Sequence, residues 1–211
     1  MKNRNKVYVR FIKSSLDRVF AILLFFATLP VMIILSTILF FEGNGGIFFK
    51  QDRNGYKERA FTLYKFRTMS CRKANSGELL TDKERLTRIG RIIRKTSLDE
   101  LPQLFNIIKG DMSFIGPRPL LIKYLPYFRL EEKIRFSVKP GITGLAQVSG
   151  RNTLSWDKRL SYDVEYVKNV SFALDFKILV MTIIAVFSSQ NIVVDPESIM
   201  KNLDDERRFS F

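Results

Sequence analysis

The longest uncharged stretch of this sequence covers residues 19 to 41 and consists mainly of Phe, Ile, Leu and Val. A run of this length and composition is typical of a segment embedded in lipid. A secretory signal peptide is the alternative. However, the run is long for the apolar part of a signal and is followed by Glu42-Gly43-Asn44 instead of a small-residue cleavage site. Any fold for this chain must therefore accommodate a membrane-embedded segment.

Pro30 lies near the middle of this run, where a proline removes one helical hydrogen bond and favours a kink. Basic residues precede the run and recur within residues 50–59, so the positive-inside rule favours neither end. A helix that enters one leaflet, breaks at Pro30 and returns would satisfy both flanks, because each half spans only ~16 Å at helical rise. A kinked helix that crosses the membrane is the alternative, and these residues leave both open.

Composition narrows the chemistry that the chain can perform. Among 211 residues there are 35 Lys and Arg, 21 Asp and Glu and no His, which gives a net charge of +14. The positive excess favours anionic partners such as nucleotides, nucleic acid or acidic lipid headgroups. The lack of His excludes Ser-His-Asp catalysis, His general bases and His-ligated metal sites. The single cysteine, Cys71, cannot form an internal disulfide and is expected to be a reduced thiol on a cytoplasmic surface.

Asp99 and Glu100 form an adjacent acid pair just after a basic segment, residues 88–95, whose apolar and cationic side chains fall on different helical faces. A carboxylate among several cations suits a site that binds a polyanion. In such a site arginines hold phosphate oxygens, while the acid attacks the phosphate or binds a metal. The pair is therefore a candidate reactive centre.

A structural interpretation of the same residues is also open. Thr96 and Asp99, like Ser97 and Glu100, have the spacing of a capping box before a helix that ends near Gly110. Capping and anion binding can coexist, because the start of a helix has free N–H groups.

Three further segments carry candidate ligand contacts. Strand-like runs on both sides of Asn54-Gly55 predict a β-hairpin, with Lys65 near the end of its second strand. In residues 116–119 two prolines restrict the backbone around Arg118, which either presents this arginine to a ligand or simply makes a rigid turn. A glycine-rich stretch ending at Arg151 predicts a compact loop, but it matches neither the P-loop nor the dinucleotide fingerprint.

The remaining pattern predicts an α+β protein that is mainly helical. Helices are expected over residues 120–136, with an interruption near Pro126, over 156–167 and over 172–187, the last too short to span a membrane because it contains charges. Polar residues 70–86 predict a surface loop, and the end of the chain is expected to be solvated. The predicted organisation is a membrane segment and basic lead-in over 1–44, a catalytic domain over 45–190 and a polar tail over 191–211.

Four motifs resemble the bacterial sugar transferase family, the monotopic phosphoglycosyl transferases. They are YKFRTM at residues 64–69, RKTSLDELPQ at 94–103, GDMSFIGPRP at 110–119 and KPGITGLAQ at 139–147. The resemblance extends from about residue 12 to about residue 190 in the same order. It implies a short, single-domain monotopic protein at the cytoplasmic face of the bacterial inner membrane. In the family the embedded helix is re-entrant and is broken at a proline, often within a Ser-Pro pair. Here the pair is Leu29-Pro30, so the hydrogen bonding of the serine is missing. The break would depend on Pro30, helped by the nearby Thr28.

The resemblance also implies a reaction. A sugar-1-phosphate would pass from a UDP-sugar to undecaprenyl phosphate through an aspartyl-phosphosugar intermediate, giving the diphosphate-linked lipid and UMP in the first membrane step of glycoconjugate synthesis. Asp99 would be the nucleophile and would bind Mg²⁺, and Glu100 would support the metal or the leaving phosphate. The phosphate and nucleotide contacts would be Arg94, Arg118, Arg151 and Lys65. A carboxylate with a pKa of ~3.9 is already ionised near neutral pH, so the first step needs no His.

Two other functions remain to be weighed. A non-enzymatic, basic membrane-surface adaptor would use the acid pair only as a cap. A nucleic-acid-binding protein would explain the positive charge, but the apolar run and the lack of a recognisable nucleic-acid motif argue against it. The residues do not identify the sugar or the glycan pathway, and they leave open whether the chain forms a homo-oligomer and whether Glu100 binds metal or accepts a proton.

Overall fold

The structure is a computed structural model that describes residues 7–43, 45–74, 77–150, 154–187 and 202–207. It is mainly helical and contains two small sheets, which confirms the α+β class. The longer helices are α2 (Ser14–Glu42), α4 (Arg88–Lys95), α5 (Gln103–Lys109), α7 (Trp156–Asn169) and α8 (Phe172–Phe187). Short helices and turns are η1 (Tyr8–Lys13), η2 (Tyr56–Glu58), α3 (Asp82–Arg85), η3 (Leu98–Glu100), η4 (Ile122–Tyr127), η5 (Glu132–Ser137), α6 (Leu145–Ser149) and α9 (Leu203–Arg207).

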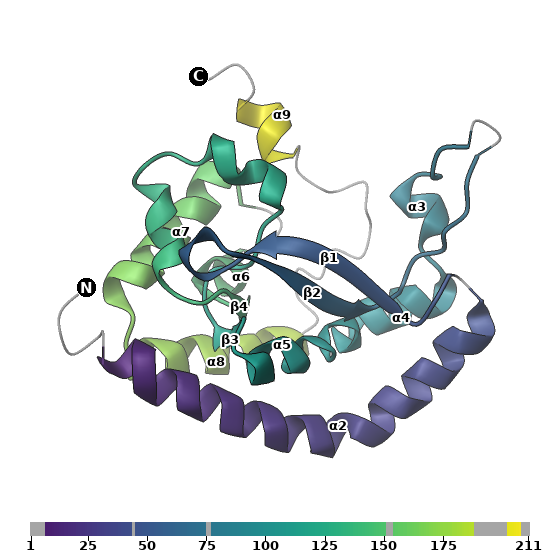
Figure 1. Cartoon of the computed structure of the whole chain (residues 1–211), viewed down its shortest axis with the longest axis horizontal. Coiled ribbons are helices and arrows are strands. Elements are labelled where there is room, and N and C mark those ends of the chain that lie inside the picture. The colour runs from purple at the N-terminus through teal and green to yellow at the C-terminus, as the bar shows by residue number, and fades with distance from the viewer. Residues whose placement is uncertain (1–6, 44, 75–76, 151–153, 188–201, 208–211) are drawn as a thin grey trace.

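Helix α2 contains the long apolar run and bends near its middle, so that both of its ends rise toward the rest of the molecule (Figure 1). Pro30 lies inside the helix, and the Thr28 hydroxyl donates a hydrogen bond of 2.8 Å to the Leu24 carbonyl one turn earlier. A proline and a threonine that bonds back to the backbone both bend helices. The helix is long and apolar enough to cross a membrane by length and composition, but its bend brings both ends to the same side of the structure (Figure 1).

A row formed by α8, α5 and α4 lies between α2 and the hairpin (Figure 1). Helix α5 supplies most of the contact with α2, because Leu104 and Ile107 are buried in one cluster with Ala21 of α2. The opposite side of α2 is covered by no described residue and exposes large apolar side chains, among them Phe20, Leu23, Phe26, Ile33, Ile34 and Phe40. The apolar run therefore packs on the protein along one narrow face only.

Strands β1 (Phe48–Asn54) and β2 (Ala60–Phe66) pair antiparallel, which confirms the predicted hairpin. The turn differs from the expected two-residue Asn-Gly connection, because Asn54 still pairs with Ala60 and the chain reverses through η2. The Asn54 side chain donates a hydrogen bond to the Leu121 carbonyl and is 2 % exposed. Asn54 thus ends a strand and fixes the hairpin to the segment after residue 119.

A second sheet, absent from the sequence prediction, pairs β3 (Ser113–Ile115) with β4 (Gly141–Thr143) in parallel. The two strands lie so close to the neighbouring turns that a Cβ on Gly116 would meet the Lys139 carbonyl oxygen at 2.5 Å. Glycine is needed at this position because two stretches of backbone touch there. The parallel pair joins the predicted compact loop to the loop that carries Arg118.

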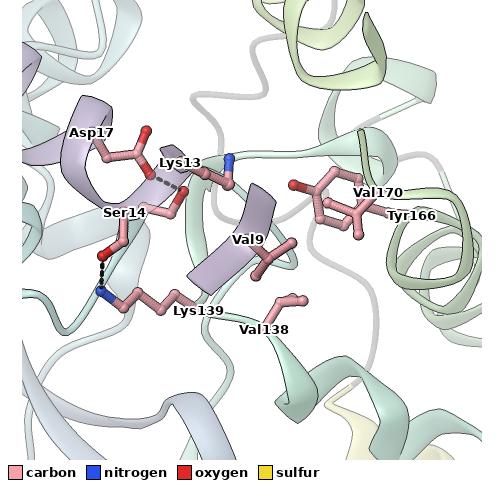
Figure 2. Close-up of a pocket in the computed structure, with 9 residues that line it drawn as sticks. Val9, Lys13, Ser14, Asp17, Val138, Lys139, Tyr166 and Val170 are labelled. Carbon is pink, nitrogen blue, oxygen red and sulfur yellow. Dashed lines mark hydrogen bonds between the residues drawn. The ribbon is translucent and has the colours of Figure 1, made fainter. Parts of the chain in front are cut away.

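The beginning of α2 is tied to α8 by a buried polar cluster. Lys13 and Asp175 form an ion pair of 2.7 Å, and the hydroxyls of Tyr8 and Tyr166 donate to the same carboxylate at 2.7 Å each. Figure 2 shows the small cavity beside this cluster, with Lys139 reaching the Ser14 hydroxyl across it. The satisfied buried charges make this junction specific to one arrangement of the two helices.

Two predictions about the remaining segments need correction. The single helix expected over residues 120–136 is two short 3₁₀ helices, η4 and η5, with an irregular stretch between them, and Pro126 lies inside the first. The polar end of the chain is only partly solvated over its described part, because two of its residues are buried. Leu203 is 0 % exposed, and Arg207 pairs with Glu132 at 2.7 Å and with Asp157.

The Arg207 pair generates a stability prediction. Arg207→Met leaves the buried Glu132 carboxylate without its cation, so we expect a loss of roughly 3–5 kcal/mol. The measurement is the denaturant midpoint of the detergent-solubilised protein. Lys123→Met, which removes the exposed pair between Lys123 and Asp204, is the control and should hardly move the midpoint. A midpoint for Arg207→Met equal to that of the wild type would contradict the role assigned to α9.

Candidate active site

The acid pair lies in η3, a single 3₁₀ turn between the basic helix α4 and helix α5. The capping-box interpretation is wrong. Ser97 has a left-handed backbone with φ of 56° and makes no side-chain cap, while the Thr96 hydroxyl donates back to the Ile92 and Ile93 carbonyls. A non-glycine residue at positive φ is uncommon, and such residues tend to cluster at active sites and in tight turns. The turn directs both carboxylates toward the hairpin.

Two cations from distant parts of the chain meet at Glu100. The Lys65 Nζ, from β2, donates to Glu100 Oε1 at 2.6 Å and lies 3.5 Å from Asp99 Oδ2. The Arg118 Nη2, from the proline-flanked loop, donates to the same Glu100 oxygen at 3.0 Å. The proline-flanked loop therefore brings Arg118 to the acid pair, and its contact with a ligand stays a prediction.

The two carboxyl groups experience opposite electrostatic effects. Burial raises the pKa of Asp99, and repulsion from Glu100 adds to this, against the attraction of Lys65. Burial would also raise the pKa of Glu100, but Lys65 and Arg118 outweigh it and lower the value to about 2. Paired titratable groups whose environments separate their pKa values are typical of catalytic sites. Glu100 is therefore a permanent anion, whereas Asp99 is the carboxylate whose charge is least stabilised.

Arg94 reaches the site from the last turn of α4. Its Nε donates to the Thr68 hydroxyl at 2.8 Å, and burial lowers its pKa while Asp99 opposes that shift. The position depends on Gly90, because any Cβ there would collide with the Thr68 carbonyl. Arg94 thus stands on the Asp99 side of the pair, and Arg118 on the Glu100 side.

Two supporting residues were missed by the sequence prediction. Asn106, 0 % exposed in α5, accepts from the Tyr64 backbone N–H at 3.2 Å and donates to the Thr62 carbonyl at 2.8 Å. It holds the strand that carries Lys65 against the helix that follows the acid pair. The only sequence signal was an amide in the middle of an apolar helical stretch.

Arg135 is the second missed residue. It is 3 % exposed, pairs with Asp163 at 2.9 Å and donates through Nη2 to the Arg118 carbonyl at 2.6 Å. It therefore fixes the backbone of the loop from which Arg118 extends, although it does not itself reach the acid pair. Its signal in the sequence, a basic residue between apolar ones, is common on protein surfaces.

Among the predicted site residues, the structure brings together Lys65, Arg94, Asp99, Glu100 and Arg118. Pro30 lies in the middle of α2, and Arg151 lies outside the described residues.

As a metal site, the described residues offer the two carboxylates of the acid pair and no group of three or more acidic, His or Cys side chains. This donor set fits Mg²⁺, which is usually bound through one or two carboxylates, with substrate phosphates and water completing its shell.

Comparison with known proteins identifies the family of this chain. The sequence profile of the bacterial sugar transferase family matches residues 8–189. The chain is 48 % identical over 181 residues to the uncharacterized sugar transferase EpsL of Bacillus subtilis, covering 86 % of this chain and 90 % of that protein.

Two further relatives have names that describe a reaction. A UDP-glucose:undecaprenyl-phosphate glucose-1-phosphate transferase of Caulobacter vibrioides is 35 % identical over 88 % of this chain and 73 % of its own length. An undecaprenyl-phosphate galactose phosphotransferase of Salmonella typhimurium is 39 % identical over 82 % of this chain but 40 % of its own length. These matches indicate an enzyme and argue against a non-enzymatic adaptor. The chain belongs to the bacterial sugar transferase family and is a phosphoglycosyl transferase.

Proposed function

We propose that this protein transfers a sugar-1-phosphate from a UDP-sugar to undecaprenyl phosphate, giving undecaprenyl-diphosphate-sugar and UMP. One observation carries the proposal: a buried carboxylate with a raised pKa, Asp99, stands beside an anion that is held by Lys65 and Arg118. This arrangement supplies a nucleophile and phosphate-binding cations in one place. The names of the relatives from Caulobacter and Salmonella support this donor and acceptor class.

In the first step an Asp99 oxygen attacks the sugar-bearing phosphorus of the donor. The new bond joins Asp99 to the phosphosugar, the bond between phosphorus and the bridging oxygen breaks, and UMP leaves with that electron pair. Lys65, Arg94 and Arg118 offset the repulsion between the attacking carboxylate and the donor phosphates. The raised pKa of Asp99 makes its anion more basic than an ordinary aspartate, and basicity favours attack.

In the second step a phosphate oxygen of undecaprenyl phosphate attacks the same phosphorus and releases the Asp99 carboxylate. Glu100 has a pKa of about 2, so it accepts a proton poorly near neutral pH. We therefore assign Glu100 an electrostatic role: its negative charge orients Lys65 and Arg118 and would help to hold the metal.

Mg²⁺ would be held by Asp99, with Glu100 beside it. When bound, it supplies positive charge that neutralises phosphate oxygens as charge redistributes. In both steps the bond that the protein forms or breaks is the one between Asp99 and the phosphosugar.

The proposed location of the protein is the cytoplasmic face of the bacterial inner membrane, with α2 inserted in one leaflet. The bend at Pro30 and the apolar side chains exposed on α2 support a re-entrant helix. A membrane-anchored site suits an acceptor whose polyprenyl chain stays in the bilayer. The step would begin the membrane stage of glycoconjugate assembly.

The direct test measures UMP. Purified protein in detergent, with Mg²⁺ and undecaprenyl phosphate, should release UMP from one member of a panel of UDP-sugars. Asp99→Asn should release none, because an amide is not a nucleophile for this step. Asp111→Asn, a change at an acid paired with Lys109 on the surface, is the control and should keep its activity. Lipid-dependent UMP release by Asp99→Asn would contradict the assignment of the nucleophile.

The pKa of Asp99 predicts a pH effect. Activity should fall on the acid side as Asp99 takes up a proton, and Lys65 normally lowers that pKa. Lys65→Met removes a cation that stabilises the carboxylate, so the acid limb of log(kcat/KM) should move to higher pH. Lys50→Met changes an exposed lysine of the same hairpin and should leave the midpoint unchanged. A midpoint that stays in place or moves to lower pH in Lys65→Met would show that Asp99 does not control this limb.

The topology has its own test. In a Cys71→Ser background, single cysteines replace Ser15 at the start of α2 and Lys50 after its end, both exposed positions. A re-entrant helix predicts that a membrane-impermeant maleimide labels both sites from the cytoplasmic side and neither from the other side. Pro30→Leu, which restores a helical hydrogen bond, should expose the Ser15 site on the opposite face in part of the molecules. Labelling of the unaltered protein from opposite sides would mean that α2 spans the membrane.

A further inference from the structure

Arg53, at the end of β1, is a cation that the proposed reaction has not used. Its side chain is half-buried, its Nε is shielded from solvent without a hydrogen-bond partner, and its Nη2 donates to Gln51. Arg53 forms no ion pair with any carboxylate among the described residues. An unpaired, partly desolvated guanidinium is costly unless an anion joins it.

The most deeply buried cations among the described residues are all paired. Three described Lys or Arg residues are almost fully buried, and each has a carboxylate partner: Lys13 pairs with Asp175, Arg135 with Asp163, and Arg207 with Glu132. Arg53 is less buried than these three residues, but its shielded Nε has no hydrogen-bond partner within the described part of the chain, so its guanidinium is free to take an anionic ligand.

The backbone brings Arg53 to the active site. Arg53 forms a β-bridge with Leu121, and the next residue donates its N–H to the Leu120 carbonyl at 3.1 Å, so β1 ends against the segment directly after the Arg118 loop. Proximity to Arg118 and burial both lower the pKa of Arg53, to about 10. The positive charge of Arg53 is therefore close enough to that of Arg118 for the two to repel, whereas Glu100 pairs with Arg118 alone of the two.

The register of the hairpin gives the direction of the side chain. Phe49 pairs with Lys65 and Arg53 with Phe61, and paired residues separated by even numbers share one face. Arg53 therefore lies on the same face as Lys65, farther from the acid pair along the strand.

We infer that Arg53, together with Arg118, binds the donor phosphate that leaves as UMP. Asp99 is close to Lys65 and Arg94, which would face the phosphate that is attacked, whereas Arg118 and Arg53 extend the line of positive charge beyond Glu100. A diphosphate laid along this line would give each phosphate its own pair of cations. Arginine suits the position, because its planar fork donates two hydrogen bonds to one phosphate.

The inference rests on the proposed function and is tested by binding, without turnover. UMP and uridine are titrated against the full-length protein in detergent, as wild type, Arg53→Gln and Arg53→Lys. Arg53→Gln should weaken UMP binding by about tenfold or more, the effect of losing a charged hydrogen bond, and leave uridine binding unchanged. Arg53→Lys keeps the positive charge but not the planar guanidinium, so its affinity for UMP should lie between those of the wild type and Arg53→Gln. Arg59→Gln, at an exposed position of the same hairpin, is the control and should bind both ligands like the wild type.

The outcomes separate the two claims. If the wild type prefers UMP to uridine and Arg53→Gln keeps that preference, the inference is wrong and the proposed function stands. If Arg53→Gln weakens UMP and uridine by the same factor, Arg53 only supports the fold. If the wild type shows no preference for UMP, the proposed donor is wrong and the inference is lost with it.

Discussion

The repulsion between two adjacent carboxylates is the constraint on which this structure depends. Asp99 and Glu100 are both largely shielded from water, where like charges repel strongly. Lys65 and Arg118 relieve that repulsion at Glu100 and leave Asp99 comparatively exposed to it. Much of the architecture serves these two cations: Asn106 fixes the strand of Lys65, and Arg135 fixes the loop of Arg118.

Local structure was predictable wherever a single segment determines it. Helices α4, α7 and α8 begin at the predicted residues. Helical periodicity and helix-breaking residues can be recognised within a short stretch of sequence. The hairpin was also predictable, although not its turn. The capping-box prediction failed because Ser97 takes a left-handed backbone without a side-chain cap, and the Thr96 hydroxyl bonds back to the preceding helix.

The candidate site was predictable as a set of motifs but not as an arrangement. Lys65 and Glu100 are 35 positions apart, and no local rule joins them. Arg53 and Asn106 were not predicted either, because a single Arg or Asn gives no periodic signal in the sequence. The docking of Arg207 within the tail was not predicted, because the acids that bind it lie 75 and 50 positions away. Tertiary partners, and not propensity, determine these contacts.

The ion pair between Lys13 and Asp175 also bears on the order of events during synthesis. A ribosome makes α2 first and Asp175 last of the elements that hold it, so the ammonium of Lys13 has no carboxylate partner until nearly the whole catalytic region has emerged. In the proposed re-entrant topology, α2 therefore enters lipid before this carboxylate is available to hold it. The pair thus joins a residue made near the start of the chain to one made near its end.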